Sequence, residues 1–521
     1  MEYAKEQADV EHRVVTTPPL SDVKLADAKT TANGVVLVPQ PTDDPRDPLN
    51  WPQRKKYLIL SILCLAGFAS NVSALANQLA LGTQAKVYHK TLVETSYAVS
   101  AAIAGVAAGP LLLVPLAQMF GKSSVIFWTL LATVGCGIWS ALMTHRDQYN
   151  AFVVARLFSG LFGSVPTILG SGAIMDIFFL HERGLAFTTL AISFLLGTVA
   201  GPTFGGFVVQ SSPWPIVFWW TVGLQALVAI LVFCFLEETG FTRDSLRVYP
   251  VLPHSFIPNR IYTFFPGTRV VPRVSVSHVA WYAATPFLIG VSPVGFLICF
   301  YQFIFFGWFV MVNTLLAVFL QEPPKHGGYG FSPLQTAAFS FSLWFGVILA
   351  QVYGALINDR LPLWICRRRG GIWKPEYRLH CLWVPAVLVP TGLGIFGACV
   401  EHHYHYMVLA VGAFLLTFGA MLCVPVSINY VAECFTHHAQ ESSNIMALFR
   451  LSLGLAVPFF VDPWEAKVGV GWVFGMAAFF SILGSCLIAL LVWKGEKIRK
   501  WSFKSVASDE GGARVTKGMA L

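Results

Sequence analysis

The sequence predicts an all-α polytopic membrane protein with 12 transmembrane helices arranged as two six-helix bundles. The chain has 521 residues, of which 55% are hydrophobic and only 12% are charged. A soluble domain carries roughly 25% charged residues. The apolar residues gather into 12 long segments, each near the roughly 20 residues that a spanning helix needs. The alternating pattern of an outer-membrane barrel is absent.

The order of these segments predicts the domain organisation. Residues 1–55 are polar and are expected to form a disordered cytoplasmic arm without a cleavable signal peptide. Residues 56–236 are expected to form the N-terminal bundle, with spans at 57–80, 93–117, 124–143, 150–178, 186–209 and 214–236. A cytoplasmic loop, 237–284, follows. Residues 285–494 are expected to form the C-terminal bundle, and 495–521 a cytoplasmic tail. The spans expected there are 293–320, 333–356, 381–400, 405–430, 441–462 and 471–493.

The distribution of basic residues predicts the orientation. Most Lys and Arg residues fall in one set of loops, whereas the opposite loops hold only Lys86, Lys90, Arg146, Lys325 and Lys467. The positive-inside rule then places both termini in the cytoplasm. The net charge of +8 is explained by this bias and needs no nucleic-acid partner. A plasma-membrane location is expected, with the vacuolar membrane as the alternative.

Several motifs are weak evidence for other chemistry. The stretch "GLGIFG", 392–397, fits the dinucleotide fingerprint but lies inside a span with no strand before it. His402, His403 and His405 cluster in a short outer loop, where a solvated loop is favoured over a metal site. The ten cysteines form no paired motif. We therefore expect no cofactor, no metal and no enzymatic activity.

Seven motifs, in order, give the chain a family resemblance. They are "PLAQMFGK", "ARLFSGLFGSVPTILGSGAIMDIF", "HERGLA", "GTVAGPTFGGF", "INDR", "NYVAECF" and "ALFRLSLGLAVPFF". Together they resemble fungal transporters of the major facilitator superfamily, close to the drug:proton antiporter branch. The resemblance implies the major facilitator fold and alternating access between two bundles.

A glycine-rich motif lies in the fifth span. Gly197, Gly201 and Gly205 recur every four residues, which makes a smooth stripe for close helix packing. Pro202 removes a backbone hydrogen bond, and Gly206 completes the motif. The resemblance implies a gate in which this span packs against the eighth. Tight packing without a gating role is the alternative.

Charged residues within the spans are candidates for proton coupling. Arg156 lies roughly 10 Å into the fourth span at 1.5 Å per residue, and the resemblance implies a role in proton release. Snorkelling to the surface is the alternative. Arg450 lies near the middle of the eleventh span, and Glu433 is its hypothesised partner. The resemblance further implies inner charge networks of Asp176, Glu182 and Arg183 in the first half and Asp359 and Arg360 in the second. Gln118 and Lys122 depart from the family pattern of the first inner loop.

The resemblance implies a substrate cavity lined by spans one, four, seven and ten. The polar and aromatic side chains available there are Asn71, Asn77, Gln78, Tyr301, Gln302, Trp308 and Asn313. The scarcity of cavity carboxylates argues against a polycationic substrate.

These observations favour a proton-coupled secondary transporter that exports a small organic compound, a drug or a fungal secondary metabolite. Its expected partners are that substrate, protons and the lipid bilayer, and a monomer is expected. Proton-symport uptake of a small organic cation or nutrient stays open, as does a transceptor that senses a ligand with the same fold. A membrane enzyme is disfavoured, and the absence of an ATP motif disfavours primary pumping.

Overall fold

The computed structural model consists of helices. It describes residues 39–506 apart from 45, 242–252, 254, 266–275, 324–327, 359, 370–372 and 436–437, and these residues contain no β-strand. Among them, 11 helices are long and apolar enough to cross a membrane. A twelfth span is present if Gln440–Ala456 and Phe459–Val468, which meet at 48°, count as one. These helices overlap the predicted spans, and the all-helical prediction is confirmed.

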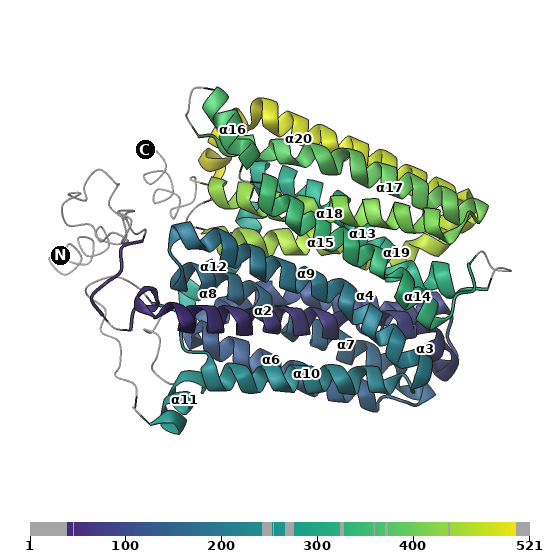
Figure 1. Ribbon diagram of the computed structural model, residues 1–521, viewed down its shortest axis with the longest axis horizontal. Helices are drawn as coiled ribbons and strands as arrows, with labels where there is room; N and C mark the ends of the chain where they lie inside the picture. Colours follow the sequence, from purple (N-terminus) through teal and green to yellow (C-terminus); the bar gives the residue numbers. More distant parts are fainter. Residues whose placement is uncertain are drawn as a thin grey trace.

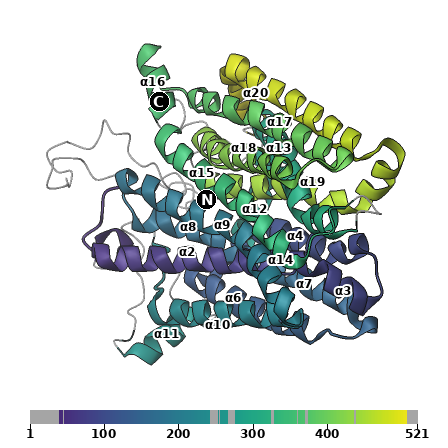
Figure 2. The same ribbon diagram turned by 45° about the vertical axis from the view of Figure 1, so that its right-hand side comes forward.

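Helices from the first part of the chain lie together, as do those from the last part (Figures 1 and 2). The first group comprises α2 (Gln53–Leu75), α3 (Leu81–Tyr88), α4 (Leu92–Leu113), α5 (Ala117–Phe120), α6 (Lys122–Leu142), α7 (Tyr149–Gly163), α8 (Val165–Ile177), α9 (Leu180–Ser211) and α10 (Pro215–Phe235). The connecting helices are α11 (Phe256–Phe264) and α12 (Val276–Val291). The second group comprises α13 (Pro293–Gln321), α14 (Pro333–Phe339), α15 (Phe341–Ile357), α16 (Arg360–Arg368), α17 (Trp383–His402), α18 (Tyr406–Cys434), α19 (Ala439–Val468) and α20 (Val470–Val506).

Local sequence signals explain where several helices begin. Thr91 Oγ1 accepts a hydrogen bond from Glu94 N at 3.1 Å, and the Glu94 carboxylate accepts one from Thr91 N at 2.9 Å. This capping box satisfies two backbone donors at the start of α4. Ser332 and Gln335 form the same device before α14. Helices α10, α13 and α14 also carry a proline in their first turn, where its missing N–H costs nothing.

The two ends of the bundle differ in charge. We call the end where α2 begins the basic end, because Lys55, Lys122 and Arg183 lie there. Helices α11 and α16 lie at the same end (Figure 1). The opposite end, with α3 and α14, is the far end.

Helix α13 lies at the centre of the second group. Of its most apolar window, 94% is buried inside the protein, against 28% for α20. The largest hydrophobic cluster contains most of α13 and also includes Leu79, Ile103 and Leu195 from the first group. This cluster therefore extends from the second group across to the first, and a cavity at that boundary can be lined by both groups.

Candidate functional site

A cavity lies between the two groups of helices. The first group contributes side chains from α2, α4, α8 and α9, together with Ser164 at the junction of α7 and α8. The second group contributes side chains from α13 and α19. Most of the lining is aliphatic or aromatic, and the polar lining residues are Asn71, Ser164, Thr167, Thr198, Asn313, Thr314 and Arg450. This composition suits an organic molecule with a large apolar part.

Two of the seven predicted cavity residues, Asn71 and Asn313, line this cavity. Gln302 instead donates to the Cys423 carbonyl oxygen on α18 at 2.8 Å. Gln78 donates to the backbone carbonyl of Asn313, so it joins the two groups beside the cavity. Asn77, Tyr301 and Trp308 are buried in the surrounding protein.

The spans that line the cavity also differ from the expectation. Among the described residues, α18 contributes no lining side chain, whereas α4, α9 and α19 contribute several. The tenth span, α18, instead packs against α13, and its Cys423 carbonyl oxygen accepts the hydrogen bond from the Gln302 amide. The polar character of Gln302 could not distinguish an internal hydrogen bond from a ligand contact.

Arg450 extends from α19 and lines the cavity. Its guanidinium carbon lies 5.0 Å from the centre of the Phe306 ring, and its Nε is buried without a hydrogen-bond partner. The hypothesised pairing with Glu433 is wrong. Glu433 accepts from Arg378 Nε at 2.6 Å and from Trp373 Nε1 at 3.2 Å. Glu433 lies at the C-terminal end of α18, where Arg378 is its ion-pair partner.

Arg156 is fully buried on α7, and the snorkelling alternative is therefore wrong. Its guanidinium donates to the carbonyl oxygens of Ser73 and Ala74, at 3.1 and 2.5 Å. These carbonyls belong to the last turn of α2, where the span breaks before the short helix Gln78–Ala80, and such carbonyls have no partner within the helix. The positive charge also complements the negative end of the helix dipole. Arg156 thus caps a helix break in the first span.

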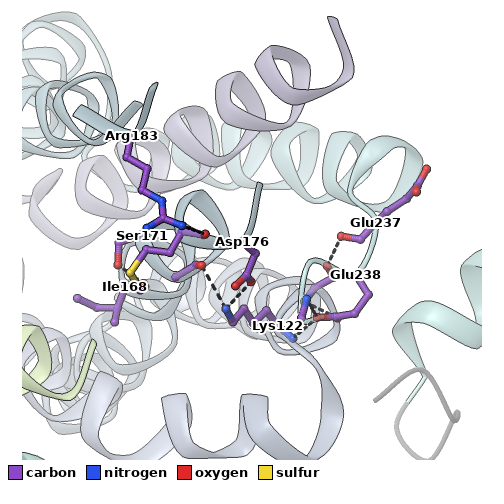
Figure 3. A network of polar contacts seen from close by, with 11 residues as sticks. Lys122, Ile168, Ser171, Asp176, Arg183, Glu237 and Glu238 are labelled. Atoms are coloured by element: carbon purple, nitrogen blue, oxygen red, sulfur yellow. Dashed lines mark hydrogen bonds and ion pairs between the residues drawn. The ribbon is translucent and has the colours of Figure 1, made fainter. Parts of the chain in front are cut away.

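A charge network lies at the basic end (Figure 3). Lys122 Nζ pairs with Asp176 at 2.6 Å and donates to the Gly172 carbonyl oxygen at 3.2 Å. Both side chains are largely buried, with 16% and 20% exposed. Lys122 therefore tethers α6 to α8. Arg183 lies beside this pair and donates to the Met175 and Phe178 carbonyl oxygens at 2.7 and 3.0 Å.

Gln118, in the first inner loop, carries no carboxylate, but a carboxylate reaches this end from another part of the chain. Glu238, just beyond α10, accepts hydrogen bonds from Lys122 N at 3.0 Å, Ser123 N at 3.1 Å and Gly240 N at 2.9 Å (Figure 3). It thereby caps the positive N-terminus of α6. Burial raises the pKa of the Glu238 carboxyl above its ordinary value despite these donors. Sequence reasoning missed Glu238, and the acidic pair that ends the sixth span was the available signal.

The other predicted charged residues are less central. Glu182 accepts from Gln53 Nε2 at 2.8 Å, which joins the start of α9 to the start of α2. Arg360 is exposed at the start of α16. Asp359 lies outside the described residues.

The glycine stripe of α9 faces the first span rather than the eighth. A Cβ at Gly201 would lie 2.6 Å from the Val72 carbonyl oxygen, and one at Gly197 would lie 2.7 Å from that of Phe68. A Cβ at Gly205 would collide with the carbonyl of Ala76. Only Gly206 faces the eighth span, where a Cβ would lie 2.9 Å from Ala337. The stripe thus provides close backbone approach to the first span. The fifth span also packs against the eighth, as the resemblance implies, at Gly206 and through the hydrogen bond between Trp344 and Thr203.

Contacts join the two groups on both sides of the cavity. At the far end the rings of Tyr97 and Phe459 stack 4.7 Å apart, and Trp344 Nε1 donates to Thr203 Oγ1 at 3.0 Å. At the basic end, Gly172 of α8 lies so close to α19 that a Cβ would be 3.1 Å from the Gln440 Oε1. The cavity is therefore bracketed by contacts that would have to break for either end to open.

Comparison with known proteins identifies the family. A model of the Major Facilitator Superfamily matches residues 58–460. The efflux pump radE of Floropilus chiversii is 28% identical over 476 residues, which cover 88% of this chain and 83% of that protein. The MFS-type transporter hepF of Aspergillus oryzae is 26% identical over 481 residues, which cover 89% and 94%.

Solved structures agree at the level of the fold. The E. coli xylose transporter XylE, in a partially occluded inward-open conformation, matches with a TM-score of 0.57 and 14% identity, covering 84% of this chain and 98% of that one. The peptide transporter POT in complex with sulfate matches with a TM-score of 0.58 and 14% identity, covering 87% and 96%. Because the family model spans most of the chain, this protein belongs to the Major Facilitator Superfamily and is a membrane transporter rather than an enzyme.

Proposed function

We propose that this protein is a proton-coupled exporter that moves a small organic compound, a drug or a secondary metabolite, out of the cytoplasm by alternating access. The observation that carries the proposal is a cavity between two groups of helices that contact each other on both sides of it. Such a cavity can be exposed to one side of the membrane at a time if the groups rock about it. Similarity to an efflux pump supports the outward direction.

We propose further that the two groups act as bundles over residues 56–236 and 285–494. The flanking segments 1–55, 237–284 and 495–521 would lie in the cytoplasm. The concentration of Lys and Arg at the basic end supports this orientation. We propose a monomer, because one chain lines the whole cavity. We propose the plasma membrane as its location.

For proton coupling we propose the Lys122–Asp176 pair at the basic end. Asp176 belongs to α8 and Lys122 to α6, and α8 is also the helix that approaches α19 at Gly172. Protonation of Asp176 would weaken its pairing with Lys122 and release a contact close to the closed end. Glu238 accepts a hydrogen bond from the backbone N of Lys122 at the start of α6, and it would thereby hold Lys122 in position.

The test is flux in proteoliposomes that contain the purified full-length chain. With an imposed proton gradient, a transported organic probe should move against the proton flow, and a protonophore should abolish net accumulation. Asp176→Asn should uncouple probe movement from the pH gradient, while Asp147→Asn, at an exposed loop position, should not. Probe movement with the proton flow would replace export by symport. Flux that ignores the gradient would contradict proton coupling.

A further inference from the structure

The charge of the cavity is unbalanced. Arg450 is the one charged side chain among the described residues that line it, and those residues include no Asp or Glu. Two acidic candidates from the sequence are engaged elsewhere, since Glu433 pairs with Arg378 and Asp176 with Lys122. The guanidinium is met by the face of Phe306 and by no carboxylate.

A cation in this position is costly unless something compensates it. A charged side chain near the middle of a membrane span is disfavoured by several kcal/mol on insertion scales. Contact with one aromatic ring recovers only part of this cost. Arg156 shows the alternative arrangement, in which two backbone carbonyls accept from the guanidinium. The Arg450 Nε is buried without a hydrogen-bond partner, and the residue lines the cavity.

The rest of the lining suggests what shape the compensating group has. Thr167 of α8 and Thr314 of α13 have hydroxyl groups that are buried without hydrogen-bond partners. The other walls are apolar, with Leu75, Phe194 and Phe309 among them. A ligand that matches this cavity has one acidic head and a large apolar body.

We infer that the cavity binds an amphipathic organic monoanion, a carboxylate or an equivalent acidic group, whose head pairs with Arg450. The guanidinium forms charge-assisted hydrogen bonds to the acid, and the fork geometry favours a carboxylate over a single-atom anion. Thr167 and Thr314 supply hydroxyl donors near the head, while the aromatic and aliphatic walls hold the body. This inference names the substrate class for the proposed transport site and otherwise rests on the cavity alone.

The experiment compares three probes that share one apolar body. They are 4-(pyren-1-yl)butyrate, its primary amide and 4-(pyren-1-yl)butylamine, whose heads are anionic, neutral and cationic. Binding to the full-length protein in lipid nanodiscs is measured by fluorescence anisotropy, with empty nanodiscs subtracted. The carboxylate should bind about tenfold or more tighter than the amide, as expected for a charge-assisted hydrogen bond, and the amine should bind weakest.

Variants locate the preference. Arg450→Gln should remove the preference for the carboxylate, and Arg450→Lys should retain part of it because the charge stays but the fork is lost. Lys467→Gln is the matched control, since it removes a positive charge from an exposed position on the same helix. It should leave the order of the probes unchanged. Thr314→Val should weaken the carboxylate and the amide more than the amine, because it removes a hydroxyl donor that only their oxygens can accept. The carboxylate should still bind tightest, because Arg450 is kept.

The outcomes separate this inference from the proposed function. Equal binding of the three probes, tighter binding of the amine, or no saturable binding would overturn the inference, as would an unchanged preference in folded Arg450→Gln. Binding of the carboxylate without any flux in proteoliposomes would support the inference and contradict transport. Flux of the amine in place of the carboxylate would support transport and overturn the inference.

Discussion

Two buried arginines in the spans have opposite surroundings. Arg156 is enclosed by protein and donates to the Ser73 and Ala74 carbonyls of a broken helix. Arg450 lines a largely apolar cavity, with its guanidinium carbon 5.0 Å from the centre of the Phe306 ring. Backbone carbonyls satisfy the Arg156 guanidinium in part, although its Nε and Nη1 are buried without partners, whereas Arg450 faces the cavity that we infer to bind an anion. The same residue type therefore donates to backbone in one half and, by our inference, to a ligand in the other.

Arg156→Gln should lower the thermal stability of the purified protein. The substitution leaves at least one of two buried carbonyls without a donor, and each such group costs about 1–3 kcal/mol. The thermal stability of Arg156→Lys should fall between those of wild type and Arg156→Gln, because lysine keeps the charge and a single donor group. The melting temperature measures the effect, and Arg146→Gln, at an exposed position of the same span, is the control. Equal melting temperatures for Arg156→Gln and wild type would contradict the capping role.

Glu238 predicts a specific dependence of stability on pH. Its pKa is raised in the folded protein above the ordinary 4.5, so the folded state binds more protons than the unfolded state between the two pKa values. The contribution of Glu238 to stability is therefore highest below pH 4.5 and falls as the pH rises through the folded pKa. Melting temperatures of wild type and Glu238→Gln across this window should diverge accordingly. A constant difference at all pH values would contradict the raised pKa.

At the scale of elements, the glycine stripe of α9 shortens the distance between two spans. Gly197, Gly201 and Gly205 each place a backbone carbonyl of the first span where a side chain would otherwise stand. Since backbone cannot move aside as a flexible side chain can, these positions tolerate no Cβ without separation of the helices. The break in the first span, capped by Arg156, follows directly after the stretch that the stripe contacts.

Gly201→Ala should therefore destabilise the protein, although alanine is the better helix former. The new Cβ would meet the Val72 carbonyl oxygen at 2.6 Å, and overpacking of this kind typically costs about 1–3 kcal/mol. Gly201→Leu should have a larger effect and stop transport. Gly223→Ala in α10 is the matched control, because nothing lies within 4 Å of the added atom. Comparable melting temperatures for the two alanine variants would refute the close approach of α9 and α2.

The sequence carried information about elements more completely than about partners. Hydropathy located the spans, because a bilayer imposes length and apolar composition on each one independently. Pairing depends on which helix faces which, and that is set by the whole bundle. This is why Glu433 was assigned to Arg450 and not to Arg378, and why the contact of the glycine stripe with the first span was not predicted. Glu238 was missed for the same reason, since its donors are backbone groups distant in sequence.

At the scale of the whole molecule, the cavity lies between contacts that join the two groups at both ends. Tyr97 with Phe459, Thr203 with Trp344 and Gly172 with Gln440 lie on either side of it. Each contact is small, so a modest free energy can exchange one set for another. An interface of this kind allows two arrangements of the same rigid groups, which alternating access requires.

The most direct test fixes the far end and measures flux. In a Cys486→Ser background, Tyr97→Cys and Phe459→Cys are joined by a cleavable bifunctional thiol reagent, and probe flux is followed in proteoliposomes. The account predicts that cross-linking stops flux and that cleavage restores it. A matched pair, Phe158→Cys with Phe162→Cys on α7, links one helix to itself and should leave flux unchanged. Undiminished flux through a fully cross-linked Tyr97–Phe459 pair would contradict movement of the two groups about the cavity.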